Sequence, residues 1–231
     1  MTKRTLLTAY AVVGIANVFG EATGVTLLAN ATKPLLMPLL MAWLVVAVRD
    51  AGGFDVALTW LAVGVGFAWL GDLLLMGSGD AFFIAGIAGF LVMQVCYLLS
   101  ITSIPGPGLV RAWKVALVPY VLIWLAINLL VSAGVGTLRI PVLVYSAVAL
   151  GMAVAALDLV LRVPRNLGRR VSLGAMVFVL SDALIAMTAF GPLSEGSIAS
   201  AVIMATYVIA QAMIVTGVAE SVVAGRVAAM R

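Results

Sequence analysis

Histidine is absent from this sequence, and cysteine occurs only once, as Cys96. The first absence excludes catalytic devices built on a histidine base and metal sites ligated by histidine. A single cysteine excludes a disulfide within the chain and provides too few thiolates for a cysteine metal site. We therefore expect no metal site built on histidine or cysteine.

Charge is also scarce, because Asp, Glu, Lys and Arg make up 10% of the 231 residues, against about 25% in a soluble domain. Hydrophobic residues make up 65%, which predicts an integral membrane protein. The net charge of +4 comes from basic residues scattered over several loops, so it does not indicate nucleic-acid binding. No long linker divides the chain, and we expect one integral membrane domain over residues 1–231.

The apolar residues form eight segments, each near the roughly 20 residues that a helix needs to cross the hydrocarbon layer. Short separators rich in glycine, proline or charge lie between them. The N-terminal run is interpreted as a first span and not as a signal peptide, because it is long and Pro34 lies just beyond it. The sequence thus predicts an all-α membrane protein with eight transmembrane helices, near 5–28, 33–48, 56–77, 81–101, 112–131, 138–161, 171–190 and 197–219.

An even number of spans places both termini on one side of the membrane. If that side is the cytoplasm, 11 of the 13 Lys and Arg residues lie inside, and only Lys33 and Arg139 lie outside. This distribution follows the positive-inside rule. We expect a plasma-membrane or inner-membrane protein with cytoplasmic N- and C-termini.

Two predicted spans carry an aspartate among hydrocarbon side chains. Asp72 lies in the stretch LGDLLL and Asp182 in LSDALI, and a tyrosine follows each after 25 residues, Tyr97 and Tyr207. This match indicates a four-plus-four parallel repeat, whose axis along the membrane normal would make the two acids face each other at one depth. The match is short, and apolar sequences align easily, so a chance resemblance stays open.

A charged residue at the membrane centre costs about 2.5–3.5 kcal/mol on insertion scales. Two facing carboxylates avoid part of this cost by sharing one proton, and Lys33 would keep the other carboxylate ionised. A neutral acid and a carboxylate in one pocket are typical of acid–base catalysis. We therefore hypothesise that Asp72 and Asp182 are catalytic and lie in the outer half of the membrane, near Lys33 and Glu21. The structural alternative is that they only join helices by hydrogen bonds.

The chain resembles the YhhN family, the bacterial and animal lysoplasmalogenases, over nearly its whole length. The resemblance rests on the order and spacing of Lys33-Pro34, Gly71-Asp72, Gly86-Ile87-Ala88-Gly89-Phe90, Tyr97, Ser181-Asp182, Tyr207 and Gln211. The chain departs from the family at Gln94, where a histidine is common. If that histidine is catalytic, this protein has lost it or uses another substrate; if it only binds substrate, glutamine can replace it.

The resemblance implies an ether hydrolase that cleaves the vinyl ether bond of a lysoplasmalogen into a fatty aldehyde and a glycerophospho-headgroup. Asp72 and Asp182 would supply the proton and the stabilising anion, much as two carboxylates do in glycosidases. The lysophospholipid tail would lie between helices among the membrane lipids, and this chemistry requires no metal or organic cofactor. The expected substrate-binding residues are Lys33, Gln94, Tyr97, Ser181, Tyr207, Gln211 and Glu21.

Two alternatives stay open at this point. Paired buried acids, a repeat and a lysine also suit a lipid or proton-coupled transporter, although spans three and seven lack the internal proline expected of broken helices. A two-aspartate intramembrane protease is disfavoured, because Trp69-Leu70-Gly71 precedes Asp72 and no Pro-Ala-Leu triplet occurs.

Overall fold

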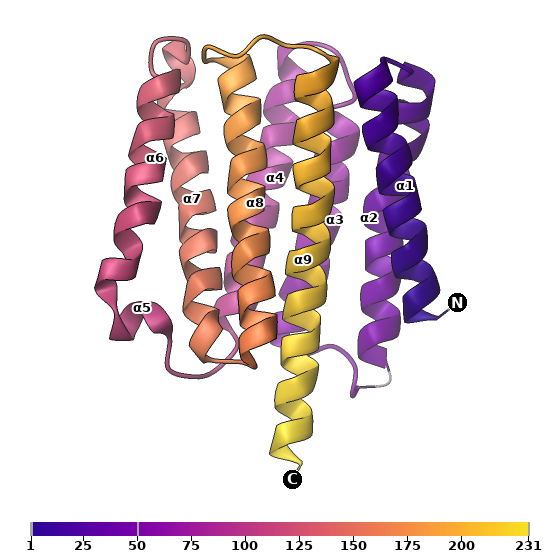
Figure 1. Ribbon diagram of the computed structural model, residues 1–231, viewed down its shortest axis with the longest axis vertical. Helices are drawn as coiled ribbons and strands as arrows, with labels where there is room; N and C mark the ends of the chain where they lie inside the picture. Colours follow the sequence, from indigo (N-terminus) through magenta and orange to yellow (C-terminus); the bar gives the residue numbers. More distant parts are fainter. Residues whose placement is uncertain (1, 50, 231) are drawn as a thin grey trace.

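The computed structural model describes residues 2–49 and 51–230; Met1, Asp50 and Arg231 lie outside the described residues. In this part of the chain every regular element is helical, and eight segments are long and apolar enough to cross a membrane (Figure 1). The predicted all-α class and the predicted number of spans are therefore confirmed. The α-helices are α1 (Lys3–Thr23), α2 (Thr26–Arg49), α3 (Val56–Leu74), α4 (Asp80–Thr102), α5 (Leu109–Ala112), α6 (Val118–Val131), α7 (Arg139–Asp158), α8 (Arg165–Ala189) and α9 (Ser197–Ala229).

Three short 3-10 helices complete the fifth and sixth spans. One at Lys114–Leu117 leads into α6, and two at Gly136–Leu138 and Leu159–Leu161 flank α7. Figure 1 shows both termini at one end of the bundle, where α9 extends beyond the other helices. The side of the membrane on which this end lies, and the four-plus-four repeat, stay predictions.

The turn between the first two spans lies earlier than the sequence predicts. Gly24 adopts a left-handed backbone conformation (φ 73°), and its N–H bonds to the carbonyls of Gly20 and Glu21. Glycine accepts this conformation without strain and ends a helix there. Because α2 begins at Thr26, the expectation that Lys33 opens the second span is wrong: Lys33 lies well inside α2, followed by Pro34 within the helix.

The last span is longer than predicted, since α9 runs to Ala229 and not to residue 219. Arg226 accounts for this extension. Its guanidinium donates to the carbonyls of Ala51 and Gly53 and pairs with Asp55 at 2.8 Å. The extra turns of α9 thereby hold the loop between α2 and α3.

The helix that carries Asp72 packs closely on α4 because both present glycine at the contact. A Cβ placed on Gly89 of α4 would lie 3.2 Å from the Cα of Gly71 of α3. Small residues at such contacts let helix backbones approach in membranes. At the other extreme, α6 has Val131 as its one buried residue among those described. The bundle is thus tightly packed around α3 and α4 and open beside α6.

Candidate functional site

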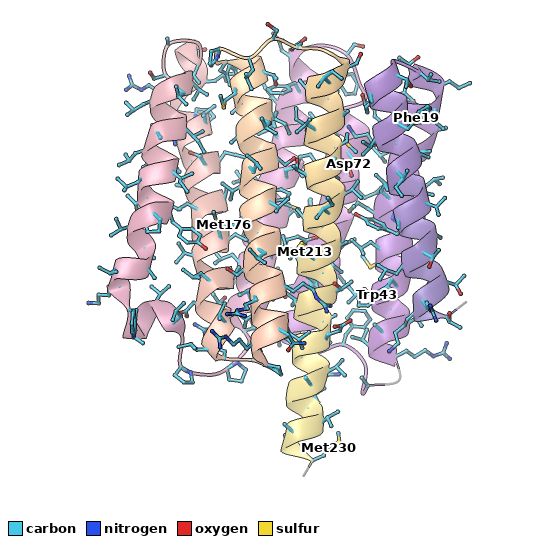
Figure 2. All side chains as sticks on the ribbon, in the orientation of Figure 1. Phe19, Trp43, Asp72, Met176, Met213 and Met230 are labelled. Carbon is cyan, nitrogen blue, oxygen red and sulfur yellow. The ribbon has the colours of Figure 1, made fainter. Side chains whose placement is uncertain are left out.

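An apolar cavity of about 390 Å³ lies between α4, α6, α7 and α8. Its volume falls in the range of about 300–1,000 Å³ that is usual for small-molecule sites. Most of the lining side chains are hydrocarbon, and Met176, one of them, is labelled in Figure 2. The polar lining residues are Tyr120, Trp124, Asn128, Tyr145, Ser146 and Asp182. The cavity therefore suits a ligand that is mostly hydrocarbon with one reactive polar part.

Asp182 is the one carboxylate among the described lining residues. Its Oδ2 accepts two hydrogen bonds, from Gln94 Nε2 at 2.8 Å and from the Tyr145 hydroxyl at 2.9 Å. Its Oδ1 accepts none from the described residues, and it is not among the fully buried atoms that lack a partner. The carboxyl is therefore fixed through one oxygen while the other stays accessible.

Ser181 sets the orientation of this acid. Its side chain is 1% exposed, and its hydroxyl donates to the carbonyl of Ile203 on α9 at 3.0 Å. Successive helix residues are rotated by about 100°, so a serine that faces α9 turns the next residue toward the neighbouring side of α8. Ser181 thus acts in helix packing beside the cavity, and it does not line the cavity.

Gln94 is fully buried on α4, and its two amide atoms differ in their surroundings. The nitrogen donates to Asp182, while Oε1 is buried without a partner among the described residues. An unpartnered buried acceptor costs about 1–3 kcal/mol, and buried groups of this kind commonly bind an ordered water or act at a functional site. Gln94 therefore places a free acceptor beside the accessible carboxyl.

Asp72 has separate surroundings. It is 2% exposed in the last turns of α3, and its Oδ2 accepts the Tyr207 hydroxyl of α9 at 2.7 Å. Figure 2 shows it in the half of the bundle away from both termini. The Tyr207 ring meets Phe90 edge-on at 5.7 Å and packs against Phe178. Asp72 is not among the residues that line the cavity.

The two aspartates thus share no hydrogen-bond donor among the described residues. The donors are crossed: α4, which follows the helix of Asp72, supplies Gln94 to Asp182, and α9, which follows the helix of Asp182, supplies Tyr207 to Asp72. The two donors are not equivalent in the predicted repeat, because Tyr97, the counterpart of Tyr207, donates to Gln211 and not to Asp182. The repeat therefore stays a prediction. Of the two aspartates, Asp182 lines the cavity and Asp72 does not.

Two other predicted substrate-binding residues contact each other. The Tyr97 hydroxyl of α4 donates to Gln211 Oε1 of α9 at 2.7 Å, and both side chains are fully buried. Gln211 Nε2 lies 3.2 Å from Met93 Sδ. Their hydrogen-bonding groups are occupied within the protein, so the structure places these two residues in the contact between α4 and α9 and not in the cavity wall.

Lys33 and Glu21 lie on the far side of the bundle from the cavity helices. Lys33 is partly exposed on α2, and it makes no ion pair with a described residue. Glu21 is in the last turn of α1, where its backbone carbonyl accepts from Gly24. Neither residue lines the cavity. The predicted action of Lys33 on one of the two carboxylates stays a prediction.

The sequence reasoning missed Tyr145, although this residue donates directly to Asp182. Nothing in its local sequence, VLVYSAVA, distinguishes it from an interfacial tyrosine. The adjacent Ser146 receives a hydrogen bond from Trp124 Nε1 at 3.0 Å and approaches Asn128 Oδ1 at 3.3 Å. These contacts join α6 to α7 along the cavity. No group of three acids, histidines or cysteines that could hold a metal ion occurs in the described residues.

Comparison with known proteins identifies a family. The model of the YhhN family matches residues 28–218, a range that includes both aspartates and all three of their side-chain hydrogen-bond donors. Neither a curated protein nor a solved structure gives a match. Because the match covers most of the sequence, the chain belongs to the YhhN family.

Proposed function

We propose that this protein is an intramembrane lipid hydrolase that cleaves the vinyl ether bond of lysoplasmalogen-type lysophospholipids. The products would be a fatty aldehyde and a glycerophospho-headgroup. Membership of the YhhN family supports the class of reaction. The observation that carries the proposal is an accessible carboxyl, Asp182, in the wall of a cavity lined mostly by hydrocarbon.

The cavity accounts for the lipid part of the substrate. A fatty tail that enters from the bilayer exchanges one hydrocarbon environment for another, so its binding does not require transfer through water. The weak burial of α6 leaves one wall of the cavity next to the surrounding lipid. A substrate that approaches laterally would meet Asp182 once its tail lies between α4, α6, α7 and α8.

The proposed chemistry begins with a proton on Asp182 Oδ1. Two hydrogen bonds already occupy Oδ2, so Oδ1 is the oxygen free to carry and transfer the proton. The electron pair of the vinyl C=C bond takes this proton at the carbon distant from oxygen, and the carbon bound to oxygen becomes an oxocarbenium ion. The carboxylate that remains stabilises this cation, as carboxylates do in glycosidases.

Water completes the reaction. It forms a bond to the oxocarbenium carbon and returns a proton to Asp182, which restores the acid. The resulting hemiacetal breaks its bond to the glycerol oxygen, which receives the hydroxyl proton, and the aldehyde leaves. One water is consumed. Gln94 does not line the cavity, and its part in this step is to hold Asp182 Oδ2 through the amide N–H while Oδ1 exchanges the proton.

Asp72 has a different task in this proposal. Its carboxylate fixes the Tyr207 hydroxyl, and the Tyr207 ring packs on Phe178, about one helical turn before Asp182 on α8. Asp72 is therefore proposed as a positioning residue for α8. That both carboxylates act directly on the substrate stays a prediction, which paired variants of the two aspartates test.

The test of the function is product analysis with purified protein in liposomes. The panel would contain three lysolipids of equal chain length, with a vinyl ether, a saturated ether and an ester. We expect aldehyde from the vinyl ether alone. In water enriched in ¹⁸O, with the aldehyde reduced as it forms, the label should appear in the aldehyde-derived alcohol and not in the glycerol. Movement of lipid across the membrane without product would favour the transporter.

A further inference from the structure

A second, smaller hollow of about 140 Å³ lies where α6 ends and α7 begins. Its lining residues are Trp124, Leu125, Asn128, Leu129, Val131, Ser132, Val135, Arg139, Val142 and Leu143. Four of them, Trp124, Asn128, Val131 and Val142, also line the large cavity. The two hollows therefore adjoin each other across these side chains, and one elongated ligand can occupy both.

Arg139 gives the smaller hollow its charge. It is exposed, it is the first residue of α7, and it makes no hydrogen bond or ion pair with any described residue. A guanidinium matches the oxygens of a phosphate group in shape and charge.

The other cation predicted on this side of the membrane does not serve the cavity. Lys33 lies on α2, and it lines neither hollow. The expectation that Lys33 binds the substrate therefore does not suit a ligand that reaches Asp182. Arg139 is the basic residue among the described lining residues of the two adjoining hollows.

The spacing along α7 fits a lysophospholipid. Tyr145, which donates to Asp182, follows Arg139 by six residues, a rise of about 9 Å along the helix. In a lysophospholipid a glycerol unit separates the phosphate from the ether oxygen, and the arginine side chain is long enough to shorten the remaining gap. Asn128 lines both hollows, and Ser146, which donates to Asn128 Oδ1, lines the large cavity, so these two side chains offer polar groups to the glycerol unit.

We propose that Arg139 binds the phosphate group of the substrate while the hydrocarbon tail occupies the large cavity. The effect of this site on catalysis rests on the proposed function. Binding of phosphate at Arg139 does not depend on turnover and can be measured without it. It makes the phosphate, and not only the tail, a determinant of specificity.

The experiment measures binding of two probes that cannot be hydrolysed by this chemistry: a saturated-ether lysophosphatidylcholine and the alkylglycerol of equal chain length. The variants are Arg139→Gln and Arg139→Lys. Arg165→Gln is the matched control, because Arg165 is also an exposed first residue of a long helix, at the opposite end of the bundle. Native mass spectrometry in nanodiscs would give each dissociation constant, with inorganic phosphate as a competitor in a separate arm.

In Arg139→Gln, we expect binding of the phosphate probe to weaken by about tenfold or more, the loss expected for a charge-assisted hydrogen bond. Binding of the alkylglycerol should not change, Arg139→Lys should restore part of the affinity, and Arg165→Gln should bind both probes as the unaltered protein does. If inorganic phosphate competes with the phosphate probe in the unaltered protein but not in Arg139→Gln, the site also binds free phosphate. If inorganic phosphate still competes with the probe in Arg139→Gln, the assignment is overturned.

Equal weakening of both probes in Arg139→Gln, or no weakening of either, would also overturn it. The result is separable from that of the proposed function. If the unaltered protein binds the phosphate probe through Arg139 but releases no aldehyde from the vinyl ether, the hydrolase fails and the phosphate site stands. If aldehyde is released and Arg139→Gln changes neither binding nor KM, the site fails and the hydrolase stands.

Discussion

Replacing Asp182 by asparagine tests the proposed proton donor with little disturbance of the fold. The amide has the shape of the carboxyl, and its oxygen can accept the hydrogen bonds that Gln94 and Tyr145 now give to Oδ2. What the amide lacks is a proton that it can transfer to carbon. Removal of a general acid lowers rates by about 10²–10⁴-fold, or about 3–5 kcal/mol in the activation barrier. We expect a loss of kcat in that range.

Asp72→Asn is the matched comparison. The asparagine oxygen can still accept from Tyr207, and this residue has no surface in the cavity, so we expect a loss of less than about tenfold. Aldehyde release from a vinyl ether lysolipid in liposomes, followed by mass spectrometry, gives kcat and KM for each variant. Thermal unfolding and gel filtration check that both variants remain folded.

Two outcomes would refute this reasoning. Unchanged turnover in Asp182→Asn would show that this carboxyl donates no proton in the slow step. Equal and large losses in both variants, with both proteins folded, would mean that the two aspartates act together on the substrate, as the sequence alone suggests. The deuterium content of the product adds a separate check: in D₂O, the carbon next to the aldehyde carbon should gain one deuterium.

Three further predictions follow from the packing around the cavity. Tyr145→Phe removes one of the two hydrogen bonds that fix the Asp182 carboxyl, and such a bond contributes about 1 kcal/mol. We therefore expect kcat to fall about fivefold while KM changes little. A change in KM alone would contradict a positioning role for Tyr145. Ala149→Leu fills part of the cavity and should shift the preferred chain to a shorter one, measured with lysolipids of graded length; an unchanged preference would place the tail elsewhere. Gly89→Ala should destabilise the protein by about 1–3 kcal/mol in thermal unfolding, because its Cβ would meet the backbone of Gly71, whereas Gly66→Ala, which has open space, should be neutral or slightly stabilising.

The sequence by itself determined the all-α class and the number of spans. Both follow from local physics, because a helix must satisfy its own backbone in lipid and needs a fixed length of apolar residues to cross it. The sequence was a less exact guide to the residues at which the helices begin and end. The left-handed Gly24 and the contacts of Arg226 moved the boundaries of α1, α2 and α9, since one depends on a turn conformation and the other on a distant loop.

Only the tertiary structure decided which polar groups meet. In a soluble helix the polar face indicates which side is exposed, but lipid is as apolar as the protein core, so the sequence of a membrane helix gives little sign of which face meets which neighbour. For this reason the sequence suggested one pocket with both aspartates and Lys33. In the folded chain, Asp72 accepts a hydrogen bond from Tyr207, and Asp182 accepts hydrogen bonds from Gln94 and Tyr145. Of the two aspartates, Asp182 alone lines the cavity.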